Sequence, residues 1–140
     1  MRYAEVLLIY AEAMAMQNQL EPALDALNQV RRRAGFTKDL TASTKIEFMK
    51  LLRRERMVEL AFEGHRFWDI RRWKLGTTLL NDVNMHGVRP IKVAENQFKY
   101  EVVDIDGGKK RVWYDRYNRF PIPIEEIQQN TSIQQFDEWK

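Results

Sequence analysis

The chain has 140 residues, of which 44% are hydrophobic and 31% are charged, a composition unlike that of a disordered segment. No apolar run approaches the roughly 18 residues that a membrane helix needs, and the absence of Cys excludes disulfides and thiolate metal sites. The net charge of +3, from 23 Lys and Arg against 20 Asp and Glu, is weak grounds for an anionic partner, so nucleic acid is only a minor option. We therefore expect a single domain over residues 1–140, built on one core.

A helical hairpin is predicted at the N-terminus. Apolar residues of 3–17 recur at the spacing of one helical face, and after a turn at 18–20 a second helix runs to a C-cap at Gly35. Two helices joined by so short a turn lie antiparallel. Ala11 and Ala23 match the positions at which tetratricopeptide helices approach closely, so the pair is expected to be tetratricopeptide-like.

A third helix is predicted to be the longest element. Thr44 forms a capping box with Glu47, the helix is expected to run to Trp73, and Gly76 is placed just beyond its end. Gly64 lies inside this span, where it marks either a kink or a close contact with another helix.

The remaining segment is predicted to contain few helices. Residues 77–97 have the composition of a loop, with one helical turn at 77–80. Residues 98–105 and 109–114 flank Asp106-Gly107-Gly108, which predicts a β-hairpin.

An extended tail with one helical turn is expected to close the chain. Phe120-Pro121-Ile122-Pro123 is predicted to be extended because a residue before Pro avoids the helical region, and residues 124–129 are predicted to form the helical turn. The fold class is therefore mainly α, with a tetratricopeptide-like helical scaffold, a small C-terminal hairpin and an extended tail.

The third predicted helix carries charged residues within its apolar stripe. Glu55, Glu59, Arg66 and Asp69 share this face with seven apolar residues: Phe48, Leu51, Leu52, Val58, Phe62, Ile70 and Trp73. Charges that face a core are costly unless they are paired, so these four residues are predicted to form a structural ionic network. Arg66 is the expected partner of the acids, with Arg56 as a second candidate.

Two carboxylates of the same helix also allow a catalytic interpretation. Glu55 and Glu59 lie one turn apart and could act as the acid and base of a glycosidase. The structural interpretation is favoured because carboxylates beside several arginines on one helix are more often part of the fold. No catalytic residue is therefore predicted.

Four stretches of the sequence carry a family pattern. They are residues 2–13, 26–35, 55–73 and 120–123, and the most specific of them reads ERMVELAFEGHRFWDIRRW from Glu55 to Trp73. In this order they resemble the C-terminal portion of the RagB/SusD family of outer-membrane nutrient-binding lipoproteins, whose members are several times longer. The last residues depart from the family, since Asn130-Thr131-Ser132 and Phe136-Asp137-Glu138-Trp139 stand where an Asn-Pro and a Pro-Gly-Trp are usual.

This resemblance implies a cell-surface lipoprotein of the outer membrane that binds oligosaccharide, or sometimes peptide, and delivers it to a TonB-dependent SusC-like transporter. It implies a scaffold role for the helices, no catalysis and no cofactor. Because the family's ligand platform is built largely from loops outside this helical framework, no glycan-binding residue is carried over. The alternative is a free-standing tetratricopeptide-type domain that binds a peptide or a protein.

Three aromatic residues after the predicted hairpin are ligand candidates. Trp113, Tyr114 and Tyr117 could stack on sugar rings, although packing against the hairpin is the favoured interpretation.

No metal site is predicted. Asp104-Ile105-Asp106-Gly107-Gly108 resembles the start of a calcium loop but lacks its later ligands, and His65 and His86 have no companion ligands. The arginines at 31–33, 53–54 and 71–72 are interpreted as solvated faces and internal ion pairs, not as a nucleic-acid surface.

Overall fold

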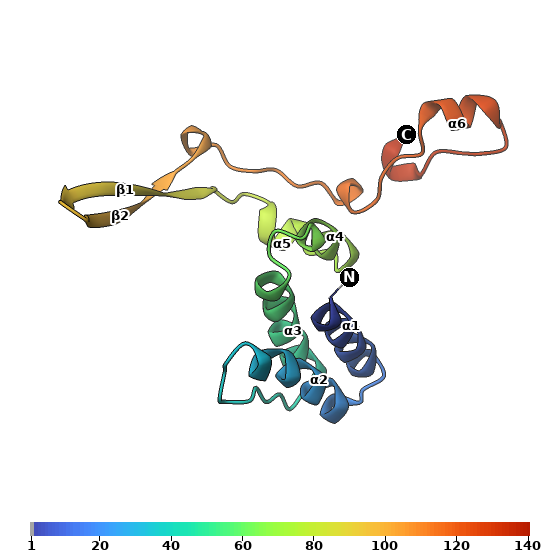
Figure 1. Cartoon of the computed structure of the whole chain (residues 1–140). Coiled ribbons are helices and arrows are strands. Elements are labelled where there is room, and N and C mark those ends of the chain that lie inside the picture. The colour runs from blue at the N-terminus through green and yellow to red at the C-terminus, as the bar shows by residue number, and fades with distance from the viewer. Residues whose placement is uncertain (1) are drawn as a thin grey trace. The chain divides into compact units, whose positions relative to one another are not determined.

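The computed structural model describes residues 2–140 and is mainly helical, as predicted (Figure 1). The chain divides into two compact units, one that ends at Trp68 and one formed by Asp69–Lys140, and each is described by itself. The assignment of a single domain to residues 1–140 stays a prediction. Within the part of the chain that the structure describes, no helix is both long and apolar enough to cross a membrane.

The first unit consists of three packed helices. These are α1 (Tyr3–Met16), α2 (Leu20–Arg33) and α3 (Lys45–Glu59), and α1 packs against both of the others. Ala11 and Ala23 are completely buried, in agreement with the close helix approach that their spacing predicts. The largest fully buried side chains form the centre of this unit: Phe48, Leu8, Leu27, Leu52 and Val30.

The first two helices end in left-handed caps. After α2, the N–H of Gly35 donates to the carbonyl of Arg32 at 3.0 Å and the N–H of Phe36 donates to that of Arg31 at 3.1 Å. Gly35 has a φ of 90°, which this cap requires, and Asn18 occupies the equivalent position after α1 with a φ of 62°. These caps fix the boundaries of the predicted hairpin.

The third helix is shorter than predicted. Its capping box is confirmed, since the Thr44 hydroxyl accepts from the N–H of Glu47 and the Glu47 carboxylate accepts from the N–H of Thr44. The prediction of one helix to Trp73 is wrong, because the backbone turns left-handed at Phe62 (φ 64°) and Gly64 (φ 80°). A right-handed helix cannot continue through two such residues.

A separate helix, α4 (His65–Arg72), follows this break. The break also changes which residues are buried: Val58 is 63% exposed and Phe62 is fully exposed, although both were expected to face the core. Phe48, Leu52 and Ile70 are buried as expected.

The second unit contains a short helix and a hairpin. Helix α5 (Gly76–Leu80) confirms the helical turn predicted at 77–80. Strands β1 (His86–Ala94) and β2 (Gln97–Asp104) pair antiparallel and form the two-stranded ribbon in Figure 1. The turn between them uses Asn96 at a φ of 59°.

The hairpin is therefore formed by different strands from those predicted. Strand β2 nearly coincides with the predicted strand at 98–105, but it pairs with the preceding segment, and Asp106–Gly108 forms only a 3-10 turn. The preceding segment was predicted to be a loop because of its turn-forming residues: Asn81, Asn84, Gly87 and Pro90. In a two-stranded ribbon each strand keeps a free edge, where Pro is tolerated, and Pro90 lies opposite Tyr100.

The tail follows the prediction more closely. A 3-10 turn at Asp115–Asn118 precedes the extended Phe120–Pro123 segment, and helix α6 (Ile124–Gln129) matches the predicted helical turn. A final 3-10 turn covers Asp137–Trp139.

Candidate functional site

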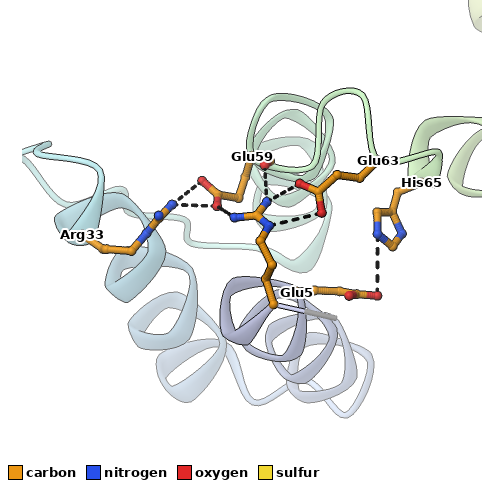
Figure 2. Close-up of polar contacts among 6 residues, drawn as sticks. Glu5, Arg33, Glu59, Glu63 and His65 are labelled. Carbon is orange, nitrogen blue, oxygen red and sulfur yellow. Dashed lines mark hydrogen bonds and ion pairs between the residues drawn. The ribbon is translucent and has the colours of Figure 1, made fainter.

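The acids of α3 bind arginines from the other helices of the first unit. The side chain of Glu59 is 10% exposed and accepts from Arg33 at 2.6 and 2.7 Å and from Arg2 at 2.7 Å (Figure 2). Glu55, one turn earlier, accepts from Arg31 at 2.9 Å, and both of these side chains are largely buried. Arg31 and Arg33 of α2 thus fix α2 against α3 through separate ion pairs.

Arg2, the residue before α1, binds the end of α3. Besides the Glu59 carboxylate, it donates to the Glu59 backbone carbonyl at 2.6 Å and to both oxygens of Glu63, at 2.5 and 3.2 Å. These hydrogen bonds lower the pKa of the Glu63 carboxyl, and they raise the pKa of Arg2 above its ordinary value. Beside them, His65 lies 3.7 Å from Glu5 (Figure 2).

The partners of the acids differ from those expected. The arginines that bind Glu55 and Glu59 come from α1, α2 and their flanks, and Arg66 is half-buried on α4 without being one of them. Asp69, in the second unit, is 3% exposed and accepts from Arg72 at 2.8 Å. The spacing of charges along one helix could not reveal these partners, because they lie on other helices. A single network that includes Arg66 stays a prediction.

This arrangement suits a structural role better than acid–base catalysis. A cavity of about 310 Å³ opens beside Glu55, but Glu59 is not among its lining residues. The two carboxylates therefore do not share this cavity, and each binds its own arginines. Two catalytic carboxylates must instead face one bound sugar from either side of the scissile bond.

The three aromatic candidates come together in the second unit. The rings of Trp113 and Tyr117 meet edge-to-face at 5.7 Å, and those of Tyr114 and Tyr117 meet at 5.6 Å. Trp113 packs on Gly76, where an added Cβ would lie 1.9 Å from its ring. Trp113 thus contributes to packing, whereas Tyr114 is 54% exposed and Tyr117 is half-buried. Ligand contact by these residues stays a prediction.

Arginines lie over the rings of this cluster. The Arg116 guanidinium carbon is 5.3 Å from the centre of the Tyr114 ring and 5.2 Å from that of Trp139. Arg71 lies 5.2 Å from Trp113, and desolvation lowers the pKa of its guanidinium. Such cation–π contacts attract a guanidinium to the face of the ring.

A cavity of about 630 Å³ lies among these arginines, within the second unit. Eight residues line it: Arg71, Arg72, Lys74, Asp115, Arg116, Asn118, Arg119 and Glu138. Five of the eight are cations and two are acids, so positive charge dominates the lining. The Arg71-Arg72 pair and the aromatic residues are separated by the whole hairpin in the sequence, so their pattern alone does not predict that they lie together.

No metal centre is visible in residues 2–140, where no group of three or more His, Asp or Glu side chains could hold an ion. The calcium-like segment is instead used in ion pairs, with Asp104 3.1 Å from His86 and Asp106 3.4 Å from Arg111.

Comparison with known proteins identifies the family. The family model of the SusD family matches residues 1–139, nearly the whole chain. The chain belongs to the SusD family. This confirms the resemblance carried by residues 2–13, 26–35, 55–73 and 120–123.

Two relatives of this SusD-family chain share part of its sequence, and a solved structure shares its fold. "SusD-like protein P2" of Formosa agariphila is 42% identical over 84 residues, which cover 54% of this chain and 17% of that protein. "SusD-like protein P38" of the same organism is 31% identical over 91 residues, covering 59% and 18%. The crystal structure of a SusD-like protein from Bacteroides fragilis NCTC 9343 superposes with a TM-score of 0.80 at 37% identity, over 96% of this chain and 24% of that one. The chain thus spans about a quarter of its solved relative.

Proposed function

We propose that this chain is the helical scaffold portion of a cell-surface nutrient-binding protein that captures glycan and delivers it to a TonB-dependent SusC-like transporter in the outer membrane. The proposal rests above all on membership of the SusD family over residues 1–139. Delivery to a barrel, the lipoprotein anchor and the glycan are properties proposed for the whole protein, because the chain spans only part of its relatives.

The geometry of the first unit supports a scaffold role. Three helices pack around fully buried apolar side chains, and ion pairs from Arg2, Arg31 and Arg33 bind the end of α3 to its neighbours. The largely buried pair of Arg31 and Glu55 holds one arrangement of helices, because separating it would leave a charge away from water. Such a unit can carry ligand-binding loops without changing shape.

The ion pairs of Glu55 and Glu59 argue against a glycosidase that uses these two carboxylates. A glycosidase would need Glu55 and Glu59 directed at substrate, and both bind arginines of the first unit. We therefore propose a binding protein without catalytic residues and without a cofactor.

The proposal is tested with the whole protein that contains this sequence. An affinity-tagged copy, expressed in its own host and extracted from outer membranes with mild detergent, is expected to co-purify with a TonB-dependent barrel. Calorimetry on the purified protein is expected to detect an oligosaccharide. If no barrel co-purifies and neither oligosaccharides nor nutrient peptides bind, the proposal is overturned, and the tetratricopeptide-type interaction domain becomes the better account.

A further inference from the structure

The basic cavity of the second unit is built from three separate segments of the chain. Arg71, Arg72 and Lys74 come from the end of α4 and its cap, Arg116 and Arg119 follow β2, and Glu138 belongs to the final 3-10 turn. The contact between α5 and the 3-10 turn at Asp115–Asn118 brings the first two segments together. Thr77 of α5 adds a hydrogen bond to this contact, since its hydroxyl donates to Asp115 at 2.8 Å.

The way these arginines are held leaves their hydrogen-bond donors available. Arg116 lies over the rings of Tyr114 and Trp139, and Arg119 lies 4.3 Å from the centre of the Phe136 ring. The N–H groups of a guanidinium point outward in its plane. An arginine beside these rings can therefore bind a carboxylate or a sulfate with two hydrogen bonds.

The cations of the lining differ in how they are paired, since Arg72 donates to Asp69 at 2.8 Å. Within residues 2–140 no ion pair joins Lys74 or Arg116 to a carboxylate, and Arg119 is 3.7 Å from Glu138. Burial already lowers the pKa of Arg71, so its charge is partly desolvated. An anion that enters the cavity would therefore meet the charges of Lys74 and Arg116 without displacing a carboxylate from them.

The size and the mixed lining exclude a bare anion as the best ligand. A cavity of about 630 Å³ lies within the range of roughly 300–1,000 Å³ that small organic ligands occupy, far more than a single sulfate fills. The carboxylates of Asp115 and Glu138 can accept hydrogen bonds, but they repel an anion placed against them. The lining thus suits a molecule that carries both hydroxyl donors and an acidic group.

From this juxtaposition of arginines beside aromatic rings and of carboxylates around one cavity, we propose that the second unit binds an acidic sugar, with a carboxylate or sulfate ester held by Arg116, Arg119 and Lys74. The hydroxyl groups of the same sugar donate to Asp115 and Glu138. This inference rests on the proposed capture of glycan and adds a preference for charged glycan, together with a site in this part of the chain.

The test compares three oligosaccharides of equal length by calorimetry: an oligogalacturonate, a sulfated carrageenan oligosaccharide and a neutral malto-oligosaccharide. The protein is the whole protein that contains this sequence, with inorganic sulfate as a fourth probe. We expect an acidic oligosaccharide to bind at least tenfold more tightly than the neutral one and to weaken as sodium chloride is raised. The first two probes distinguish a carboxylate from a sulfate ester as the group recognised.

Matched variants locate the site. Arg116→Gln and Arg119→Gln each remove one charge and are expected to weaken acidic binding by about tenfold or more, the usual effect of losing a charge-assisted hydrogen bond. Arg89→Gln removes the same charge from an exposed position on β1 and is expected to leave affinity within about twofold. Because Arg116 and Arg119 are exposed, circular dichroism is expected to be unchanged in both variants.

Three results would overturn the inference. These are equal binding of neutral and acidic oligosaccharides, equal losses in Arg89→Gln and Arg116→Gln, which indicate non-specific attraction, and sulfate binding as tight as that of the acidic oligosaccharides. None of these three results contradicts the proposed function, which depends on the barrel partner and on nutrient binding by the whole protein. A whole protein that binds only neutral glycan would retain the proposed function and contradict this inference.

Discussion

The two units of the chain differ in how they are held together. In the described residues of the first unit, twelve apolar side chains are buried, whereas in the second unit only Ile70 is. The second unit instead carries half-exposed aromatic rings, arginines and a hairpin exposed on most of its length. Burial of apolar area stabilises a fold without regard to direction, while exposed rings and charges are available to a ligand. The comparison separates a scaffold from a candidate binding surface.

Truncation of the buried core is expected to give the largest difference between the units. Phe48→Ala removes a ring that is completely buried and should lower the free energy of unfolding by about 3–5 kcal/mol. The matched change Phe98→Ala on β2, at a side chain 52% exposed, should cost about 1 kcal/mol or less. Urea unfolding measures both, and equal losses would contradict the division into scaffold and surface.

The buried ion pair is expected to have the next largest effect. Glu55→Gln leaves Arg31, whose side chain is 18% exposed, without its carboxylate, and should cost about 3 kcal/mol. In the second unit, Glu101→Gln removes the exposed partner of Lys99 and should cost about 0.5 kcal/mol or less. If Glu55→Gln keeps its stability but abolishes a measured glycoside hydrolysis, the structural interpretation of Glu55 is wrong.

The packing of Trp113 on Gly76 provides a test inside the second unit. Gly76→Ala places a Cβ within 1.9 Å of the indole ring, so the ring must move, and we expect a loss of about 1–3 kcal/mol. In Gly87→Ala the added Cβ lies 3.1 Å from the Ile105 side chain and 4.0 Å from that of Val103, so this change should cost less. Tryptophan fluorescence is expected to shift in the first variant alone. Unchanged stability and fluorescence in Gly76→Ala would show that Trp113 is free to face a ligand.

The smallest expected effect is a dependence on pH in the first unit. Because Arg2 lowers the pKa of Glu63 in the folded chain, this pair stabilises the fold above the ordinary Glu pKa of about 4.3. That contribution is lost as the pH falls through the lowered folded pKa. The urea midpoint of the wild type should therefore fall more steeply with acid than that of Glu63→Gln. Glu95→Gln, an exposed acid near the hairpin turn, should follow the wild type.

The sequence predicted the first unit better than the second for a physical reason. Helix hydrogen bonds and caps are local, so Thr44, Glu47 and Gly35 could be assigned from their neighbours, and the family pattern identified the helices. The break after α3 depends on the conformations of Phe62 and Gly64, and only the glycine gave a signal. A phenylalanine in a left-handed conformation has no recognisable pattern.

Pairing between distant residues was harder to predict. The choice of strand partner for β2 depends on register, and the preceding segment, with which it pairs, had the composition of a loop. The arginines that bind Glu55 and Glu59 lie 24 to 57 positions away along the chain, beyond the reach of helical spacing. The basic cavity was hard to predict for the same reason, since Arg71 and Arg116 are distant in the sequence and come together only in the folded chain.

Lys74 joins the cap of α4 to the basic cavity, and this creates a trade-off. Its φ of 52° closes the helix, with its N–H donating to the carbonyl of Arg71 at 2.9 Å. A side chain in this conformation costs about 1 kcal/mol that glycine would not. Lys74→Gly is therefore expected to raise the melting temperature while it weakens binding of acidic sugar. Stability and affinity would then move in opposite directions at one position.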